Sequence, residues 1–378
     1  MKKLSIQNIV VPIDFSKMSL QAIQTASRLA RRFSASIHLV HVRQFDSIDF
    51  VAPAPPIVPF SFMPYAQDGE RTIFKELKAV ARDYGISSAN CHLLGGAPAF
   101  DEICRLAQKI PADLIVMPTH GRTGLKHVFL GSTAERVVQH SPCPVFVVRS
   151  KKRKLETRRT FTPRTIIVPV DFSSCSREGL QYAIGLANEF GARIILLHAT
   201  YLGYIYSSEG TAIYDVPALQ KAARENAERK MRKLVQSVNF GGAKFETVFT
   251  EGSPVLDICA FAKDHDVDLI ITSTHGLTGF QHVLIGSIAE HVVRHAACSV
   301  LVVPSHPHVR TANLAKSGGA KAGTLPGSPR RIRPVAGRQQ LRKSPLGKAL
   351  TRKDHKLAAH AFPERRKTNK FRESHLSR

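Results

Sequence analysis

The sequence predicts two tandem α/β domains, each a doubly wound, Rossmann-like fold around a five-stranded parallel sheet, followed by a disordered basic tail. Three observations predict this class. The first half of the chain returns in the second half, short β-branched runs alternate with stretches of helical periodicity, and the end of the chain is poor in large apolar residues. We expect a first domain over residues 1–149, a basic linker over 150–163, a second domain over 164–304 and a tail over 305–378.

The internal repeat is visible as matching strings in the same order. NIVVPIDFS at 8–16 returns as TIIVPVDFS at 165–173, and ADLIVMPTHG at 112–121 returns as VDLIITSTHG at 267–276. The offset is 157 residues in the first pair and 155 in the second, so the copies differ by two residues in an intervening loop. Whole elements kept in order indicate a tandem duplication.

Within the first copy, apolar strand-like runs alternate with amphipathic stretches. Strands that are apolar throughout and alternate with helices indicate a parallel sheet covered on both faces, and right-handed crossovers favour a doubly wound order. The expected elements are a strand at 8–13, a helix around 20–33, a strand at 36–42, a loop at 51–64, a helix around 74–84, a strand at 91–94, a helix at 100–110, a strand at 113–118, a helix at 133–140 and a strand at 144–148.

Ligands of doubly wound sheets bind beyond the carboxyl ends of the strands, where the strand order reverses. Asp14 follows the first strand, Val42 ends the second, and a glycine-rich loop begins at Thr119 after the fourth. Asp14 and its counterpart Asp171 either accept a hydrogen bond from an amino group of a ligand or cap the helix that follows.

The glycine-rich loop has the composition of an anion site. Gly121, Gly124 and Gly131 permit positive φ angles and close approach of a ligand to the main chain. Ser132 and Thr133 precede a helix whose free amides and dipole attract a phosphate, and they either donate hydroxyl groups or provide the N-cap. The alternative is that these residues only make a turn and cap a helix.

Two further observations limit the chemistry. The loop lacks the Gly-Lys-Ser/Thr ending of a P-loop, and no nucleophile, base and orienting group recur together. We therefore expect no catalytic residue and, at most, a slow ATPase activity. His120 and His275 recur, but such a histidine more often bonds the backbone than a metal, and we expect no metal site. The six cysteines show no zinc spacing and are expected in the core of a protein from a reducing compartment.

The ordered motifs PIDFS, HV, THGRTGLKHVFLGSTAERV and SPCPVFVV, present in both copies in varied form, resemble the universal stress protein family in its tandem-domain form. The resemblance covers about residues 4–149 and 164–304. It implies that ATP, with Mg²⁺ as its possible companion, occupies the loop in the nucleotide-binding branch, whereas other members lack the site. The residues it implies for binding are Pro12, Asp14, Val42, Gly121, Gly131, Ser132 and Thr133 in the first copy, and Asp171, Ala199, Gly276, Gly286 and Ser287 in the second.

The loop departs from the family pattern at one place in each copy. Pro118 and Ser273 stand where the family has its first glycine. We therefore keep two functions open: a stress-response protein that binds an adenine nucleotide, and a nucleotide-free scaffold or signalling module. The resemblance also implies pairing through the last strands, either between the two copies of one chain or in a homodimer.

The net charge of +25 is concentrated outside the predicted domains. The chain from Pro304 onward carries 19 Lys and Arg against 3 Asp and Glu, and residues 149–159 carry 7 against 1. Such a tail either is solvated or binds nucleic acid weakly through phosphates. The beginning of the sequence lacks a signal-peptide pattern and no apolar run reaches the length of a membrane span, so a cytoplasmic location without membrane partners is expected.

Overall fold

The computed structural model describes residues 4–43, 64–119, 130–149, 162–200, 216–274 and 286–305. The chain divides into two units, Met1–Asn313 and Leu314–Arg378, and all described residues lie in the first. Several predicted features lie outside the described residues: nearly all of the loop at 51–64, most of the basic linker, the tail after Ser305, and the residues His120, Gly121, Gly124, His275 and Gly276.

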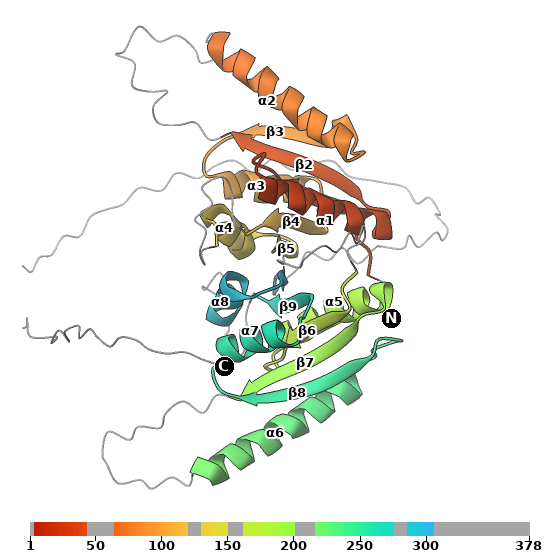
Figure 1. Ribbon diagram of the computed structural model, residues 1–378, viewed down its shortest axis with the longest axis vertical. Coiled ribbons are helices and arrows are strands. Elements are labelled where there is room, and N and C mark those ends of the chain that lie inside the picture. Colours follow the sequence, from red (N-terminus) through yellow and green to blue (C-terminus); the bar gives the residue numbers. More distant parts are fainter. Residues whose placement is uncertain are drawn as a thin grey trace, which may run out of the picture. The chain divides into compact units, whose positions relative to one another are not determined.

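The first copy contains five strands and four α-helices among the described residues, in the predicted alternation (Figure 1). Helix α1 begins after Ser16, whose hydroxyl accepts a hydrogen bond from the Ser19 amide at 3.2 Å. The elements are β1 (Asn8–Pro12), α1 (Lys17–Phe33), β2 (Ser36–Arg43), α2 (Pro64–Asp83), the short 3₁₀ helix η3 (Ser88–Asn90), β3 (Cys91–Gly95), α3 (Ala99–Lys109), β4 (Leu114–Pro118), α4 (Ser132–His140) and β5 (Val145–Val148).

The second copy repeats this series. Ser173 caps α5 as Ser16 caps α1, and α5 ends at Gly191, whose φ of 68° is the left-handed conformation that glycine adopts without strain. Its elements are β6 (Thr165–Pro169), α5 (Ser174–Phe190), β7 (Arg193–Thr200), α6 (Val216–Ser237), β8 (Phe245–Glu251), α7 (Pro254–Asp264), β9 (Leu269–Ser273), α8 (Ser287–His295) and β10 (Ser299–Val303).

The strands form one sheet in the order β3-β2-β1-β4-β5-β10-β9-β6-β7-β8. All strand pairs within a copy are parallel, which confirms the predicted fold class of two doubly wound domains with five parallel strands each. The strand order reverses between β1 and β4 in the first copy and between β6 and β9 in the second. The two halves join where β5 and β10 pair antiparallel, with Phe146 opposite Leu301.

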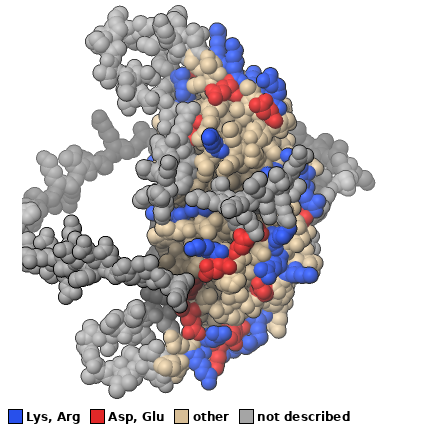
Figure 2. All heavy atoms as spheres, in the orientation of Figure 1, with Lys and Arg blue, Asp and Glu red and all other residues tan. Residues whose placement is uncertain are grey.

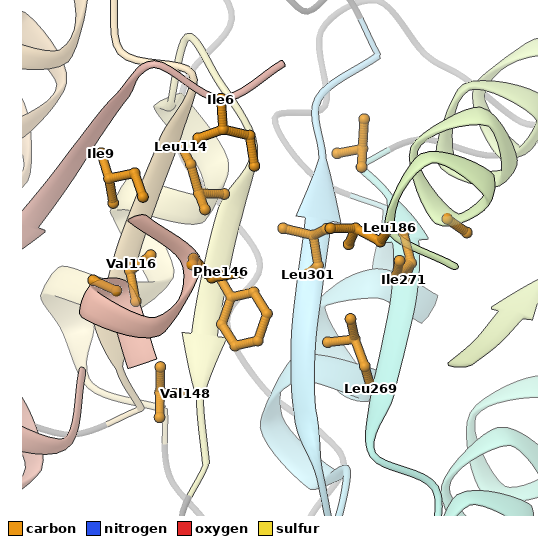
Figure 3. Packing of buried hydrophobic residues seen from close by; sticks show 14 of the residues in the cluster. Ile6, Ile9, Leu114, Val116, Phe146, Val148, Leu186, Leu269, Ile271 and Leu301 are labelled. Carbon is orange, nitrogen blue, oxygen red and sulfur yellow. The ribbon is translucent and has the colours of Figure 1, made fainter. Parts of the chain in front are cut away.

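Two apolar cores lie on the opposite faces of this sheet. Alternate residues of β1 divide between them, since Ile9 and Val11 face one core and Val10 faces the other. The first core includes residues of α1, α2, α5 and α6, and the second includes residues of α3, α4, α7 and α8. Figure 3 shows Phe146 of β5 and Leu301 of β10 in the layer where the two copies meet. Each core therefore continues from one copy into the other.

Charged side chains of both signs are interspersed on the face of the molecule that Figure 2 shows. The described helices include none that is long and apolar enough to cross a membrane.

Candidate functional site

The strand-end aspartates organise the turn between strand and helix in both copies. Asp14 Oδ1 accepts a hydrogen bond from the Ser16 amide at 3.0 Å. Asp171 Oδ1 accepts from the Ser173 amide at 3.0 Å and from its hydroxyl at 2.6 Å. The serine, and not the aspartate, is the N-cap of the helix, so the expectation that the aspartate caps the helix directly was wrong. The carboxylate is instead held at the carboxyl end of the strand, beside the reversal of strand order.

Each aspartate is followed by a phenylalanine with a left-handed backbone. Phe15 has a φ of 62° and Phe172 a φ of 68°, a conformation that costs a bulky residue about 1 to 3 kcal/mol. Their rings pack against His41 and His198, with centroids 4.9 Å and 4.6 Å apart. Sequence reasoning missed this arrangement, although all four residues recur at matching places.

The same histidines also connect the first two strands of each copy through a side-chain hydrogen bond to the backbone. His41 Nδ1 donates to the Ile13 carbonyl at 2.8 Å, and His198 Nδ1 donates to the Val170 carbonyl at 2.6 Å. Because a carbonyl only accepts, the Nδ1 atom carries the proton in both rings. The imidazole thus satisfies a backbone carbonyl just beyond the end of the strand.

The backbone of Val42 faces the crevice at the reversal point. The Val40 carbonyl accepts from the Ile13 amide on the β1 side, whereas the Arg43 carbonyl accepts from the Gly96 amide on the β3 side. Val42 follows Val40 by two residues and therefore points its backbone groups toward β1, which has already ended at Pro12. By its matching place in β7, Ala199 has the same relation to β6, which ends at Pro169. Both predicted main-chain contacts thus lie at the expected edge of the sheet.

Helices α4 and α8 begin at the same edge, each with a glycine as N-cap and, within the described ranges, no side-chain cap hydrogen bond. The Gly131 amide donates to the Thr119 carbonyl at 2.8 Å, and the Gly286 amide donates to the Thr274 carbonyl at 2.6 Å. Ser132 and Ser287 are the first helical residues, where backbone amides have no partner within the helix.

The structure excludes one of the two alternatives for Ser132 and Thr133, and Gly131 does not use the positive φ that glycine permits. Gly131 has a φ of −63° and Gly286 a φ of −69°, because an N-cap residue takes an extended conformation open to any residue type. Neither Ser132 nor Thr133 provides the N-cap. Both lie within the first turn of the helix instead, so their amides belong to the set that can bind an anion.

Pro118 and Ser273, the departures from the family pattern, are the last residues of β4 and β9. Pro118 pairs with Val148 and Ser273 pairs with Val303, so both continue the ladder toward the central strands. Pro118 is buried, and Ser273 is half-buried. In each copy, the residue that stands in place of the family's first glycine is therefore part of a sheet strand.

The two copies differ in polarity beside the predicted main-chain contacts. Val42 stands opposite Leu94 in the first copy, whereas Ala199 stands opposite Thr250 in the second. The Thr250 hydroxyl is buried and has no hydrogen-bond partner among the described residues. At the helix start, Thr133 of the first copy is replaced by Ile288, whose surface is 41% exposed. Leu94 provides an apolar wall in the first copy, and Thr133 a hydroxyl at its helix start.

The cysteines of the first copy are core residues. Burial raises the pKa of the Cys104 thiol to about 12 and that of the Cys143 thiol to about 12, so both stay protonated and unreactive at neutral pH. Within the described ranges, no three His, Cys, Asp or Glu side chains come together as metal ligands would.

A pair of histidines links β2 and β3 of the first copy at the opposite ends of these strands. His38 Nδ1 lies 3.2 Å from His92 Nε2, and burial lowers the pKa of both rings below the ordinary value of 6.5. The unfolded chain therefore takes up these protons first as the pH falls below 6.5. The stability that the pair contributes should be present above pH 6.5 and lost as the pH falls toward the folded-state pKa values.

The second copy indicates which residues can replace the histidines, because Ile195 and Val248 occupy the places equivalent to His38 and His92. The double substitution His38→Ile and His92→Val should reduce the loss of stability on acidification. Urea unfolding above and below pH 6.5 measures this effect. An unchanged pH dependence in the variant would contradict the assignment.

Fold and site together define a tandem doubly wound α/β protein in which a helix with a glycine N-cap begins at the reversal point of each half. The model of the universal stress protein family matches residues 5–149 and 162–304, and the chain belongs to this family. Over 149 residues it is 37% identical to universal stress protein MJ0531 of Methanocaldococcus jannaschii, an overlap of 39% of this chain and 85% of that relative. Over 143 residues it is 26% identical to universal stress protein YxiE of Bacillus subtilis, covering 36% and 97% of the two chains.

Solved structures share the fold over more than one copy. A universal stress protein from Archaeoglobus fulgidus superposes with a TM-score of 0.52 at 18% identity, covering 79% of this chain and 97% of the other. A functionally unknown protein of Pseudomonas aeruginosa, PA1789, gives a TM-score of 0.54 at 17% identity and covers 79% and 92%.

Proposed function

We propose that this universal stress protein binds an adenine nucleotide at the reversal point of its first copy and acts in stress response through the state of that site. The observation that carries the proposal is the start of α4, where the N-cap is a glycine and no side chain of the described residues caps the first turn. Asp14 and the backbone of Val42 stand at the same edge of the sheet. A cationic or apolar ligand would not use these amides, whereas a phosphate would.

Each group has a distinct proposed role. The helix amides of Ser132 and Thr133 would hold the phosphates, and the main chain of Val42 would bond the edge of the base. Asp14 would accept a hydrogen bond from the amino group of adenine, a role open to a carboxylate already oriented by the Ser16 amide. Mg²⁺ would accompany ATP through its phosphate oxygens. We assign no catalytic residue.

The first copy should bind the nucleotide more tightly than the second. Leu94 gives it an apolar wall beside Val42, whereas Thr250 presents a polar group in the second copy. In calorimetric titrations of the full chain with ATP, Asp14→Asn should weaken binding more than Asp171→Asn does. The two substitutions make the same chemical change at matched positions, so each is the control for the other. A larger loss from Asp171→Asn would contradict the order of affinities.

The two copies are proposed to pair with each other within one chain. The antiparallel pairing of β5 with β10 supports this proposal, because it covers the edge that each five-stranded sheet would otherwise expose. Helices on both faces of the sheet make further contacts across the same junction, including the ion pair of Arg32 with Glu189.

Native mass spectrometry of the purified full chain tests the nucleotide proposal directly. We expect a mass increment of AMP, ADP or ATP that disappears after denaturation. A chain that carries no nucleotide and takes up none in excess ATP would favour the alternative, a nucleotide-free scaffold or signalling module.

A further inference from the structure

The contact between the copies is organised around a local two-fold axis. Leu301 stands opposite Phe146 in the pairing of β10 with β5, and these residues occupy the same position of the repeat, 155 residues apart. In such an arrangement each position close to the axis faces its own counterpart from the other copy. Phe33 and Phe190 follow this rule, because they match at an offset of 157 residues and their rings meet edge to face at 6.1 Å.

The preceding position of the repeat also faces its counterpart, but there the two copies carry opposite charges. Arg32 in α1 and Glu189 in α5 match at the same offset of 157 residues. Arg32 Nε lies 3.0 Å from Glu189 Oε1, and Arg32 Nη2 donates to the Glu189 carbonyl at 2.6 Å. Two first copies meeting through this face would bring arginine against arginine, and two second copies would bring glutamate against glutamate.

The other face of the sheet has two contacts without a symmetric counterpart. Arg149 Nη2 donates to the Val293 and Arg294 carbonyls at 3.0 Å and 2.8 Å, where it satisfies the end of α8. Arg294 Nη2 reaches Glu135 of α4 at 3.4 Å. The matching residues are Pro304 for Arg149 and Gln139 for Arg294, and neither carries a charge. A pair of two first copies would have Arg149 but no counterpart of Arg294, and a pair of two second copies would have Arg294 but no counterpart of Arg149.

The contact of Leu4 with α5 adds a steric difference between the copies. A Cβ atom on Gly185 would lie 2.7 Å from Leu4 Cβ, so this place on α5 accepts Leu4 only because it is glycine. The first copy carries Arg28 at the matching place. The same packing therefore cannot form against α1.

We propose that the surface through which the copies meet favours the pairing of a first copy with a second copy and disfavours the pairing of two identical copies. Its specificity comes from Arg32 with Glu189 at the two-fold axis and from Arg149 and Arg294 on the other side of the sheet. The partner of each copy is thus the other copy, in the same chain or exchanged with a second chain. The inference rests on the proposed pairing of the copies and is independent of nucleotide binding.

Charge reversal in the full chain tests the central contact. We expect Arg32→Glu alone, and Glu189→Arg alone, to speed hydrogen exchange of the β5 and β10 amides about fivefold, since each replaces a partly exposed ion pair by a like-charge pair. The double reversal should restore slow exchange. Arg31→Glu is the control, because Arg31 lies next to Arg32 and, among the described residues, bonds within its own helix, to the Ser27 carbonyl at 3.3 Å. Single reversals equal to this control, or a double reversal without recovery, would overturn the proposal.

Cysteine cross-linking separates the pairing from its specificity. The double variant Phe33→Cys with Phe190→Cys should be bridged between positions 33 and 190 by a short bifunctional thiol reagent, because the two native rings meet at 6.1 Å. Failure to form this bridge would contradict the pairing itself. Phe33→Cys alone should give no covalent dimer through position 33 beyond the background of the unmodified chain, as judged by peptide mapping. A 33–33 bridge forming as readily as the 33–190 bridge would overturn the specificity while leaving the pairing intact.

Discussion

Replacing Ser132 with proline should weaken nucleotide binding roughly 10- to 100-fold, because one charge-assisted hydrogen bond to a phosphate is lost. Proline is favoured at the first helical position, where its missing amide costs the helix nothing. Gly131, with φ −63° and ψ 141°, already has the extended conformation that a residue before proline requires. The substitution therefore removes one ligand-binding amide and leaves the fold in place. Calorimetric titration with ATP measures the affinity, and urea unfolding should show a change within about 0.5 kcal/mol.

Two controls make this result specific. Ser132→Ala keeps the amide and removes only the hydroxyl, so it should lower the affinity much less. Ser287→Pro makes the identical change at the start of α8, where Gly286 has nearly the same dihedral angles as Gly131. It should have the smaller effect if the first copy is the tighter site. Wild-type affinity in Ser132→Pro would mean that the phosphates do not lie on this helix, whatever else the crevice binds.

Replacing Phe146 with alanine should reduce the free energy of unfolding by about 3 to 5 kcal/mol. The side chain is 1% exposed and lies between the two copies, so its removal leaves a cavity at the junction and not at a free surface. The loss includes both the transfer of the ring from water and the cavity that neighbouring side chains cannot fill. Urea unfolding monitored by circular dichroism measures it.

The leucines of the second copy provide a matched pair for the same argument. Leu301 stands opposite Phe146 and is 1% exposed, whereas Leu256 on α7 is 69% exposed. Leu301→Ala should cost about 2 to 5 kcal/mol, and Leu256→Ala should stay within about 0.5 kcal/mol. Equal effects of the two substitutions would contradict the burial of the junction.

The sequence alone was sufficient for the strands, the helices and their duplication. Runs such as IVVP at 9–12 and LIVMP at 114–118 are apolar at every residue, as is typical of a strand buried on both faces. Helix α1 was visible in the spacing of Leu20, Ile23 and Ala26, since these residues fall on one side of a helix. The edge of the sheet that holds the candidate site followed from the same order, because ligands of such sheets lie beyond the carboxyl ends of their strands.

The details of the site depended on contacts that no local pattern encodes. The N-cap of α4 is Gly131, whose extended backbone ends at a helix that begins at Ser132, and the local sequence GST does not decide which of its residues takes that place. The left-handed turns at Phe15 and Phe172 depend on histidine rings from a neighbouring strand, which lie 26 residues further along the chain in each copy. A sequence pattern shows that these residues recur, but not that they touch.

What the sequence determined by itself is the class of each copy, since hydrophobic periodicity and repeated motifs are properties of neighbouring residues. What only the tertiary structure decided is how the copies meet. In the sequence, Arg32 and Glu189 are charged residues of two amphipathic helices, and nothing local distinguishes Arg32 from Arg31. In the fold, β5 pairs with β10, and Arg32 Nε of α1 lies 3.0 Å from Glu189 Oε1 of α5. Long-range pairing of this kind depends on geometry summed over the whole sheet, and for that reason it cannot be derived from local pattern.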